Sequence, residues 1–306
     1  MFITFSFPVV VYAGVACGAS ERGFMRSSAV LLAVMTLLSL SAAKDAFQAS
    51  DFAKQQLTSI GNEQARGTVK NQLVQGTLTF QWLNAASGAE GQLQFVSEGD
   101  KFVSVLKLPS VDYHGEQFGS DGKKSVVKQI RPGVYSALGR FVFEHPEVLT
   151  EGLWGGTLST AWALAHLDER HARLEDRGLK KIDGRDLHRV DYFPKKSSDL
   201  QIELYFEPET SRHVITVYSY HAMARGGGGP SASAGQEERY YRLEERFADF
   251  KTVDGLTLPA RWTIQYSGDP SQRAVGAGTT GISQFEVSDP KISHNISLDP
   301  RNFEIK

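Results

Sequence analysis

The chain has 306 residues, of which 41% are hydrophobic, 22% charged and 10% aromatic. This length and apolar content suit one large or two ordinary domains with a packed core. Its 33 basic and 35 acidic residues give a net charge of −2. That balance argues against a nucleic-acid-binding protein, because such proteins need a basic face to neutralise phosphates. The single cysteine, Cys17, excludes an internal disulfide framework and a cysteine-based zinc site.

Two apolar runs open the chain, Phe2–Ala19 and Ala29–Ala43. The second run follows Arg26 and ends in the small residues Ser41-Ala42-Ala43. A basic start, an apolar stretch and small residues at the end are typical of a secretory signal, and they predict cleavage before Lys44. Each run is shorter than the roughly 20 residues that span a bilayer comfortably.

We therefore expect residues 1–43 to be an N-terminal targeting region and residues 44–306 to be the mature protein. In the simplest account translation starts at Met25, inside the printed sequence. A signal of this kind sends the protein to the periplasm or the cell envelope. An uncleaved N-terminal anchor and a two-helix membrane hairpin are the alternative interpretations.

The mature part begins with one helix and then changes to strands. Apolar residues recur at helical spacing across Ala46–Ile60, and Gly61 ends the pattern. An alternation of period two follows, in which Leu78, Phe80 and Trp82 share one face. Further strands are predicted around Leu93 and Phe95, over Phe102–Leu108, and in a hairpin of Gly115–Phe118 with Val126–Ile130.

A helical segment interrupts the strands between Pro132 and Gly178, where the apolar spacing predicts two or three short helices. Gly155-Gly156 breaks this segment, and the charge-rich run Arg170–Arg177 is interpreted as its solvated helical end. Strands then return, and the tail is expected to be extended. The predicted strands are Leu179–Ile182, Asp186–Phe193, Leu200–Phe206, Arg212–His221, Glu237–Phe250, Leu256–Tyr266 and Gly281–Val287, and the tail is Asn295–Phe303.

The predicted elements amount to one α+β domain built on a large antiparallel sheet. Leu200–Phe206 alternates apolar and polar residues, which predicts one dry and one wet face. Residues 224–236 hold four consecutive glycines and are expected to be a flexible loop between two strands of this domain.

Four segments of the C-terminal half carry a family resemblance. They are KKIDGRDLHRVDYFPK (Lys180–Lys195), IELYFEPETSRHVITVYSY (Ile202–Tyr220), FADFKTVDGLTLPARWTI (Phe247–Ile264) and NISLDPRNFEIK (Asn295–Lys306). In this order and behind a signal peptide, they resemble the LolA-like superfamily of outer-membrane lipoprotein-sorting proteins. The resemblance implies a strongly curved, unclosed antiparallel sheet, or half-barrel, whose concave face is covered by helices and whose hollow binds acyl chains. Members carry lipoproteins across the periplasm, receive them at the outer membrane, or sense envelope stress.

Motifs for catalysis or metal binding are weak in this sequence. His166 and His171 are five residues apart, so on a helix they cannot share a metal as a pair four apart does. Gly156-Thr157-Leu158-Ser159-Thr160 lacks the second glycine of a nucleophile elbow. The glycines at 226–229 lack the Lys-Ser/Thr of a phosphate loop. The protein is therefore expected not to be an enzyme, with no metal and no cofactor.

The remaining signal lies in large apolar side chains on the dry strand faces and in the helical segment. We expect them to enclose an apolar ligand cavity, with Gly155 and Gly156 as the hinge of the helical cover; a solid core is the alternative, since both use the same residues. The expected function is a periplasmic, non-catalytic carrier or chaperone for the acyl chains of a lipoprotein or other lipid. An envelope stress sensor or protein-interaction scaffold, with an envelope membrane protein as partner, is the alternative. The expected lining residues are Phe80, Trp82, Phe95, Trp154, Leu158, Trp162, Phe206, Trp262 and Ile264.

Overall fold

The computed structural model describes residues 47–83, 88–110, 113–130, 133, 135–222, 239–268 and 282–304. The expected targeting region, residues 1–43, and the glycine-rich loop, residues 224–236, lie outside these described residues. The chain separates into two compact units, and the fold below is that of the second, Phe47–Lys306. Within the described ranges, no helix is both long and apolar enough to cross a membrane.

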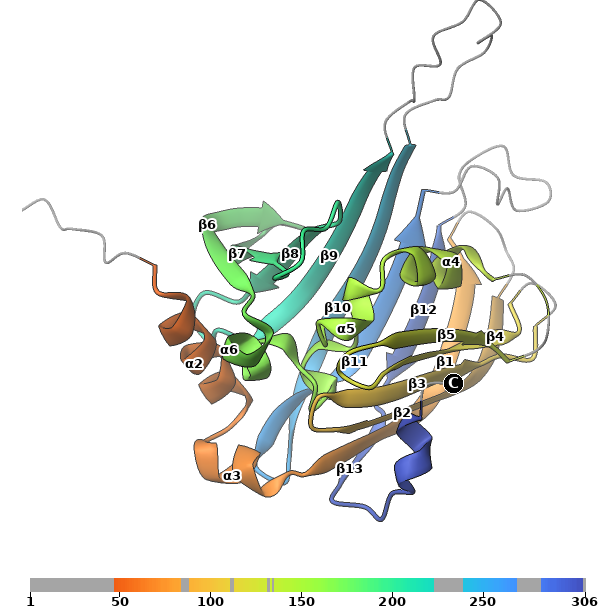
Figure 1. Cartoon of the computed structure of the whole chain (residues 1–306), viewed down its shortest axis with the longest axis horizontal. Coiled ribbons are helices and arrows are strands. Elements are labelled where there is room, and N and C mark those ends of the chain that lie inside the picture. The colour runs from red at the N-terminus through yellow and green to blue at the C-terminus, as the bar shows by residue number, and fades with distance from the viewer. Residues whose placement is uncertain are drawn as a thin grey trace, which may run out of the picture. The chain divides into compact units, whose positions relative to one another are not determined.

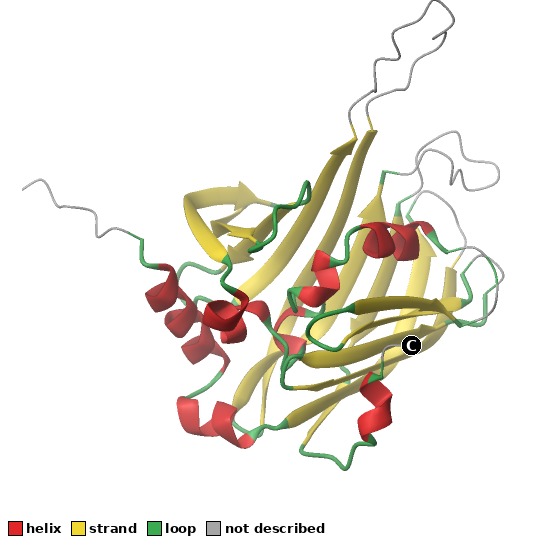
Figure 2. Cartoon of the chain, viewed as in Figure 1, coloured by secondary structure: helices red, strands yellow, loops and turns green. Residues whose placement is uncertain are grey.

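The described residues form one antiparallel sheet of thirteen strands (Figures 1 and 2). The strand order is β5-β4-β3-β2-β1-β12-β11-β10-β9-β8-β7-β6, with β13 paired to β1. The outermost strands β5 and β6 do not pair with each other, so the sheet is not closed. The strands are β1 (Asn71–Trp82), β2 (Gly88–Glu98), β3 (Lys101–Lys107), β4 (Gly115–Ser120), β5 (Ser125–Gln129), β6 (Arg173–Ile182), β7 (Arg185–Phe193), β8 (Gln201–Phe206), β9 (His213–Ala222), β10 (Arg239–Val253), β11 (Leu256–Ser267), β12 (Ser283–Ser288) and β13 (Lys291–His294).

The strand registers place the large apolar side chains on one face of the sheet. Phe80 in β1 lies opposite Phe285 in β12, which in turn lies opposite Ile264 in β11. Their sequence neighbours on β1, Thr79 and Gln81, are exposed. Since successive side chains of a strand point to opposite faces, this register gives the central strands one apolar face, as the alternation predicted.

Helices and short turns occupy the concave side of this sheet. The segment from residue 137 to residue 170, which we call the cover segment, contains α4 (Ala137–Glu144), α5 (Glu147–Thr150), α6 (Leu167–Arg170) and the 3₁₀ turns η1 (Gly156–Leu158) and η2 (Ala163–His166). Figure 1 shows α4 and α5 inside the curl of the sheet. The remaining helices are α2 (Ala49–Ile60), α3 (Glu63–Thr68) and the 3₁₀ turn η3 (Pro300–Phe303).

Ring contacts show that the cover segment fills the space between two arms of the curled sheet. Trp154 of the cover lies 4.8 Å from Phe118 on β4 and 5.5 Å from Trp262 on β11, measured between ring centroids. β4 and β11 are separated by four strands in the sheet order, so the sheet bends strongly around Trp154. The expected fold class, a large curved antiparallel sheet that stays unclosed and carries helices on its concave face, is confirmed.

The interpretation of Arg170–Arg177 as a helical end is wrong. α6 stops at Arg170, and the chain continues as the edge strand β6. The charges reflect cross-strand pairing on a solvent-facing edge: Arg177 donates to Asp191 on the neighbouring strand and to Glu175 two residues away. Leu174 is the residue of this run that points into the core. A run of charges is therefore as compatible with an edge strand as with a helix.

Three smaller elements were not predicted or differ from the prediction. Helix α3 follows α2 where strands were expected to begin, and Asn62 caps it by accepting a hydrogen bond from the Ala65 N–H. Strand β13 pairs with β1, and the tail expected to be extended ends in η3. These elements have four to six residues, which is too short for a periodic pattern to emerge.

The outer face of β7–β9 carries a second apolar cluster that the alternation did not predict. Tyr205, expected on the wet face of β8, is only 5% exposed. It packs with apolar side chains from both neighbouring strands, so this part of the sheet is buried on two faces. The buried members of this outer cluster are Leu187, Tyr205, Val214, Ile215 and Val217.

Candidate functional site

The nine residues predicted to line a cavity all belong to one apolar cluster between the sheet and the cover segment. Eight of them are at most 3% exposed, and Trp82 packs partly buried against the same cluster. Six come from strands of the sheet and three from the cover. The grouping predicted from the sequence is thus present, and its role as a ligand cavity is taken up under the proposed function.

The side chains of this cluster contact one another in two adjacent groups. In the first group, the ring of Trp262 lies 5.7 Å from Phe95 and 5.5 Å from Trp154. In the second, Trp162 stacks on His213 at 4.6 Å, and Phe206 lies 5.4 Å from the same imidazole. Because the rings touch across the two layers, a ligand that enters here has to displace the cover segment from the sheet.

Gly155 and Gly156 form a buried turn in the middle of the cover segment. Both adopt left-handed backbone conformations, with φ of 77° and 52°. A Cβ atom on Gly155 would lie 2.2 Å from the ring of Phe95, and one on Gly156 would lie 2.8 Å from the ring of Phe247. Glycine is therefore required twice over here, by the backbone conformation and by the closeness of the sheet.

A buried glutamate on the sheet anchors this turn. Glu245 on β10 accepts hydrogen bonds from the Gly155 N–H at 2.8 Å, the Trp262 indole N–H at 2.9 Å and the Tyr218 hydroxyl at 2.9 Å. Its side chain lies in the apolar core, and burial raises the pKa of Glu245 to about 7 although all three hydrogen bonds lower it. A single carboxylate thus joins β9, β10, β11 and the cover segment.

A second buried glutamate anchors the start of the cover segment. Glu116 on β4 accepts the Ser136 N–H at 2.9 Å and the Ser136 hydroxyl at 2.7 Å, and the Tyr113 hydroxyl donates to it at 3.1 Å. Ser136 in turn caps helix α4 by accepting the Gly139 N–H. Burial raises the pKa of Glu116. The two arms of the sheet therefore each hold the cover through one inward-pointing carboxylate.

Three amide and hydroxyl side chains add to the polar attachment of the cover, as do the hydrogen bonds that the Tyr192 and Ser198 hydroxyls donate to Glu151 and Glu147. The Gln72 amide donates to the Leu158 carbonyl at 2.8 Å, the Thr160 N–H donates to the Ser97 hydroxyl at 2.9 Å, and the Trp162 indole N–H donates to the Gln56 carbonyl oxygen at 2.9 Å. Sequence analysis did not single out any of these anchors or the two glutamates. The position of Glu245 in the strand could have indicated its role, because it lies between Leu243 and Phe247 at an inward place of the alternation.

Several buried polar atoms at this layer have no hydrogen-bond partner among the described protein atoms. They include the Trp154 indole N–H, the hydroxyls of Thr157 and Ser104, and Nδ1 of His213. Burial lowers the pKa of His213 to about 3, so this imidazole is neutral at physiological pH. Buried polar groups are usually paired, and an unpaired one costs about 1–3 kcal/mol. The layer therefore offers polar groups that a bound molecule could satisfy.

The two histidines considered for a shared metal, His166 and His171, do not form a metal site in the described structure. His166 Nδ1 contacts Glu169 at 2.9 Å, and its Nε2 contacts the Thr160 carbonyl at 3.0 Å. His171 is the residue after α6, in a left-handed conformation with φ of 53°. A different histidine, His145, is buried beside Glu147 and Asp199. These two acids line a polar cleft at the rim of the cover that has a volume of about 670 Å³.

Searches against known proteins gave matches among solved structures alone: no family model and no curated protein matches this chain. The matches include an outer membrane lipoprotein-sorting protein domain from Vibrio parahaemolyticus, with 14% identity, a TM-score of 0.46, and coverage of 83% of this chain and 95% of that one. A LolA superfamily protein from Nitrosomonas europaea matches with 13% identity, a TM-score of 0.45, and coverage of 85% and 99%. A DUF1329 family protein from Desulfovibrio piger matches with 11% identity, a TM-score of 0.45, and coverage of 84% and 95%.

Two of these three names, the lipoprotein-sorting domain and the LolA superfamily protein, are those of the family that the sequence motifs resemble.

Proposed function

We propose that this protein is a non-catalytic binder of acyl chains in the cell envelope, acting as a carrier or chaperone for a lipoprotein or another lipid. The acyl chain would lie on the aromatic face of the sheet, in the layer that the cover segment occupies in the described structure. Gly155 and Gly156 would serve as the point at which the cover bends. Binding of this kind needs no covalent step and no cofactor.

One observation carries the proposal: the cover segment is attached to the sheet without any backbone ladder. Among the described residues, every backbone–backbone hydrogen bond of the cover stays within residues 136–171. Its links to the sheet and to α2 are apolar contacts and a few side-chain hydrogen bonds, each worth about 0.5–1.5 kcal/mol. The cover can therefore leave the sheet while both keep their own secondary structure.

Apolar burial would be exchanged when a ligand enters. An acyl chain gains about 0.8 kcal/mol for each methylene that leaves water, so ten methylenes supply about 8 kcal/mol. This gain is comparable to the cost of releasing the side-chain anchors. The buried apolar side chains of the cover, Trp154, Leu158 and Trp162, must also contact the ligand, because each would otherwise lose about 1.5–3 kcal/mol. The aromatic face stays covered throughout, first by the cover segment and then by the ligand.

The proposal can be tested by titrating the delipidated full chain with a fluorescent sixteen-carbon fatty acid. We expect saturable binding that Phe80→Asp weakens at least tenfold, because a carboxylate then lies on the apolar face. Leu187→Asp places the same charge in the outer cluster and should leave the affinity unchanged in protein that still unfolds cooperatively. A wild-type protein that does not bind the probe, or equal affinities for both variants, would contradict acyl binding and favour the sensor or scaffold alternative.

The envelope location rests on the N-terminal targeting region proposed from the sequence. N-terminal sequencing of protein extracted from the cell envelope should begin at Lys44. A mature chain that retains Met1 or Met25 would overturn this part of the proposal and favour an anchored protein.

A further inference from the structure

Three potential metal ligands meet at the seam between the cover segment and the sheet. His145 is the residue that ends α4, Glu147 begins α5, and Asp199 lies just before β8. Their donor atoms, one nitrogen and two carboxylate oxygens, all lie within 4.8 Å of one another. No local sequence motif predicts this group, because Asp199 is more than fifty residues from the other two.

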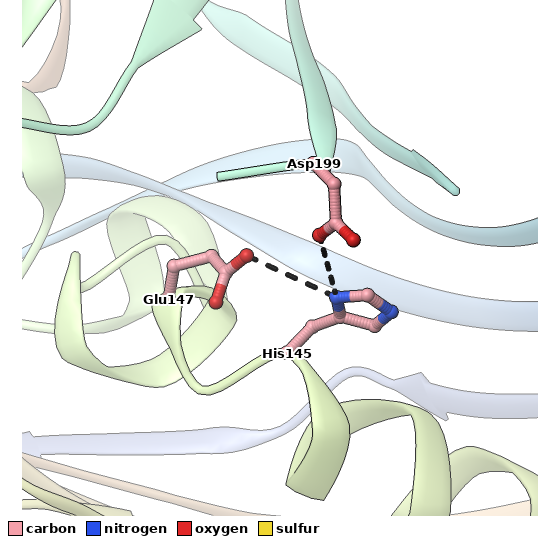
Figure 3. Close-up of side chains that lie close together, drawn as sticks. All are labelled: His145, Glu147 and Asp199. Atoms are coloured by element: carbon pink, nitrogen blue, oxygen red, sulfur yellow. Dashed lines mark ion pairs between the residues drawn. The ribbon is translucent and has the colours of Figure 1, made fainter. Parts of the chain in front are cut away.

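The imidazole of His145 is held in place with Nδ1 facing both carboxylates. Nδ1 lies 3.9 Å from Glu147 and 3.8 Å from Asp199, and Figure 3 shows it pointing between them. Both distances are too long for hydrogen bonds. The ring is packed between Phe141 and Tyr220, each 4.7 Å away, and the side chain is 7% exposed. Packing thus fixes the nitrogen while leaving it no direct hydrogen bond to either acid.

The two carboxylates differ in a way that suits a binding site with one open side. Glu147 is 16% exposed, and it accepts a hydrogen bond from the Ser198 hydroxyl, which orients it. Asp199 is 69% exposed and is free to adjust. Ser198 is itself fixed by accepting the Leu200 N–H at 3.0 Å. A partner that orients a ligating carboxylate in this way is common around bound metals.

The cleft is lined by side chains of both charges, four acidic and three basic. Glu144 and Glu151 line the cleft together with the two ligating acids, and the lysines that line it are Lys123, Lys124 and Lys196. All three lysines are exposed. An imidazole binds a metal through the lone pair of one ring nitrogen, and Nδ1 of His145 is the ring nitrogen that faces the two acids.

We infer that His145, Glu147 and Asp199 form a binding site for a divalent transition-metal cation such as Zn²⁺. Zinc binds imidazole nitrogen and carboxylate oxygen at about 2.0–2.2 Å, which places tetrahedral ligands about 3.4 Å apart. The separations of 3.8 and 3.9 Å from Nδ1 need to contract by a few tenths of an ångström. The two carboxylate oxygens lie within 4.8 Å of each other, so they need to approach by up to about 1.4 Å, which the exposed Asp199 allows. Glu147 and Asp199 line the cleft, so a fourth ligand would enter from that side.

A cation bound here would connect the cover segment to the sheet, because two ligands belong to the cover and the third lies in the connection between β7 and β8. It would therefore stabilise the closed arrangement and raise the melting temperature, since a ligand that binds only the folded state stabilises it. The three ligands are together in the closed arrangement, so metal binding does not require that the protein also binds a lipid.

The test uses the untagged full chain after treatment with a chelator. Zn²⁺ is added in a calorimetric titration, and Co²⁺ is used in parallel as a spectroscopic probe. We expect one site with micromolar or tighter affinity and visible Co²⁺ absorption bands. Asp199→Asn should weaken Zn²⁺ binding at least tenfold and remove the rise in melting temperature, whereas Asp186→Asn, at an exposed position on β7, should change neither.

His145→Gln should also abolish the Co²⁺ bands. If His145→Gln folds poorly, Asp199→Asn keeps the test decisive, since Asp199 is on the surface. Two results would overturn the inference: no Zn²⁺ binding to the wild type at 0.1 mM (about a hundred times the expected dissociation constant), or an Asp199→Asn variant that binds as tightly as the wild type.

Discussion

Glu245 should make the stability of this domain depend on pH in a way that one substitution removes. Its carboxylate is fully buried beneath the cover segment and accepts three hydrogen bonds. Glu245→Gln keeps the size of the side chain and one acceptor oxygen, and it removes the titrating group. The comparison of wild type with Glu245→Gln across pH therefore isolates the free energy that this carboxyl contributes.

The magnitude follows from the pKa. Burial raises the pKa of Glu245 from 4.5 to about 7 in the folded protein, and this difference corresponds to about 3 kcal/mol at 1.36 kcal/mol per pH unit. Because the folded state binds the proton more tightly, this group contributes stability below pH 4.5, and the contribution is lost as pH rises to about 7. His145 and His213 act in the opposite direction, since burial lowers their pKa values and their contribution is lost as pH falls below 6.5.

The assay is urea unfolding of both proteins at pH 4.5, 6 and 7.5. The free energy of unfolding of wild type minus that of Glu245→Gln should fall by about 3 kcal/mol over this range. The two histidines titrate in both proteins and cancel in the difference. Tyr218→Phe removes one donor to the carboxylate and should move the midpoint of the change to higher pH. A difference that is constant from pH 4.5 to 7.5 would refute the assignment of a buried, titrating Glu245.

Two further predictions concern the cover segment. Gly155→Ala should lower the free energy of unfolding by several kcal/mol, because the added Cβ would overlap the ring of Phe95. Gly178→Ala is also at positive φ but has open space around it, so it should cost about 1 kcal/mol. Urea unfolding measures both costs, and equal costs would contradict the close approach of Gly155 to Phe95. Leu158→Ala and Leu187→Ala each remove a fully buried leucine, and each should lower the free energy of unfolding by about 2–5 kcal/mol. Only Leu158→Ala should tighten binding of the fatty-acid probe, because it weakens the packing of the cover that competes with the ligand. An unchanged affinity would argue against displacement of the cover.

Much of the sheet was predictable from the sequence because strands such as β1 alternate between apolar and polar residues. In β1, Leu78 and Phe80 are buried while Thr79 and Gln81 are exposed, and the expected hairpin of β4 and β5 is formed. Helix α2 was equally clear, and it ends at Ile60 before Gly61 as predicted. Strand β1 and helix α2 have twelve residues each, so local pattern and tertiary structure have room to agree.

The parts that were missed depend on contacts between distant residues. The first part of the edge strand β6 was taken for a helical end, whereas Leu179–Ile182 in its second part was predicted as a strand. The charges of the first part pair with Asp191 on β7, which the segment alone does not show. Tyr205 was placed on a wet face because a second cluster on the outer side of the sheet has no signature within β8 alone. The length and charge of a segment do not show which side chains of the neighbouring strand will pack against it or pair with it.

The candidate site was predictable in its apolar part and not in its polar part. Aromatic side chains on dry strand faces meet in one layer, as expected, because the register of an antiparallel sheet keeps them on one side. The anchors Glu116 and Glu245 are single acids at inward positions of their strands. Acidic residues are rarely buried, so an acid at an inward position is a signal for a buried hydrogen-bonded carboxylate. The group around His145 joins residues brought together by the fold alone.

The most direct test of acyl binding beneath the cover is a crystal structure of the protein equilibrated with a bromine-labelled fatty acid. The anomalous signal of bromine locates the chain without dependence on the shape of its density. We predict bromine between the sheet and the displaced cover segment, in contact with Trp262, and loss of the hydrogen bond from Gly155 to Glu245. Bromine bound elsewhere on the protein, with Trp154 still packed on Trp262, would contradict the account.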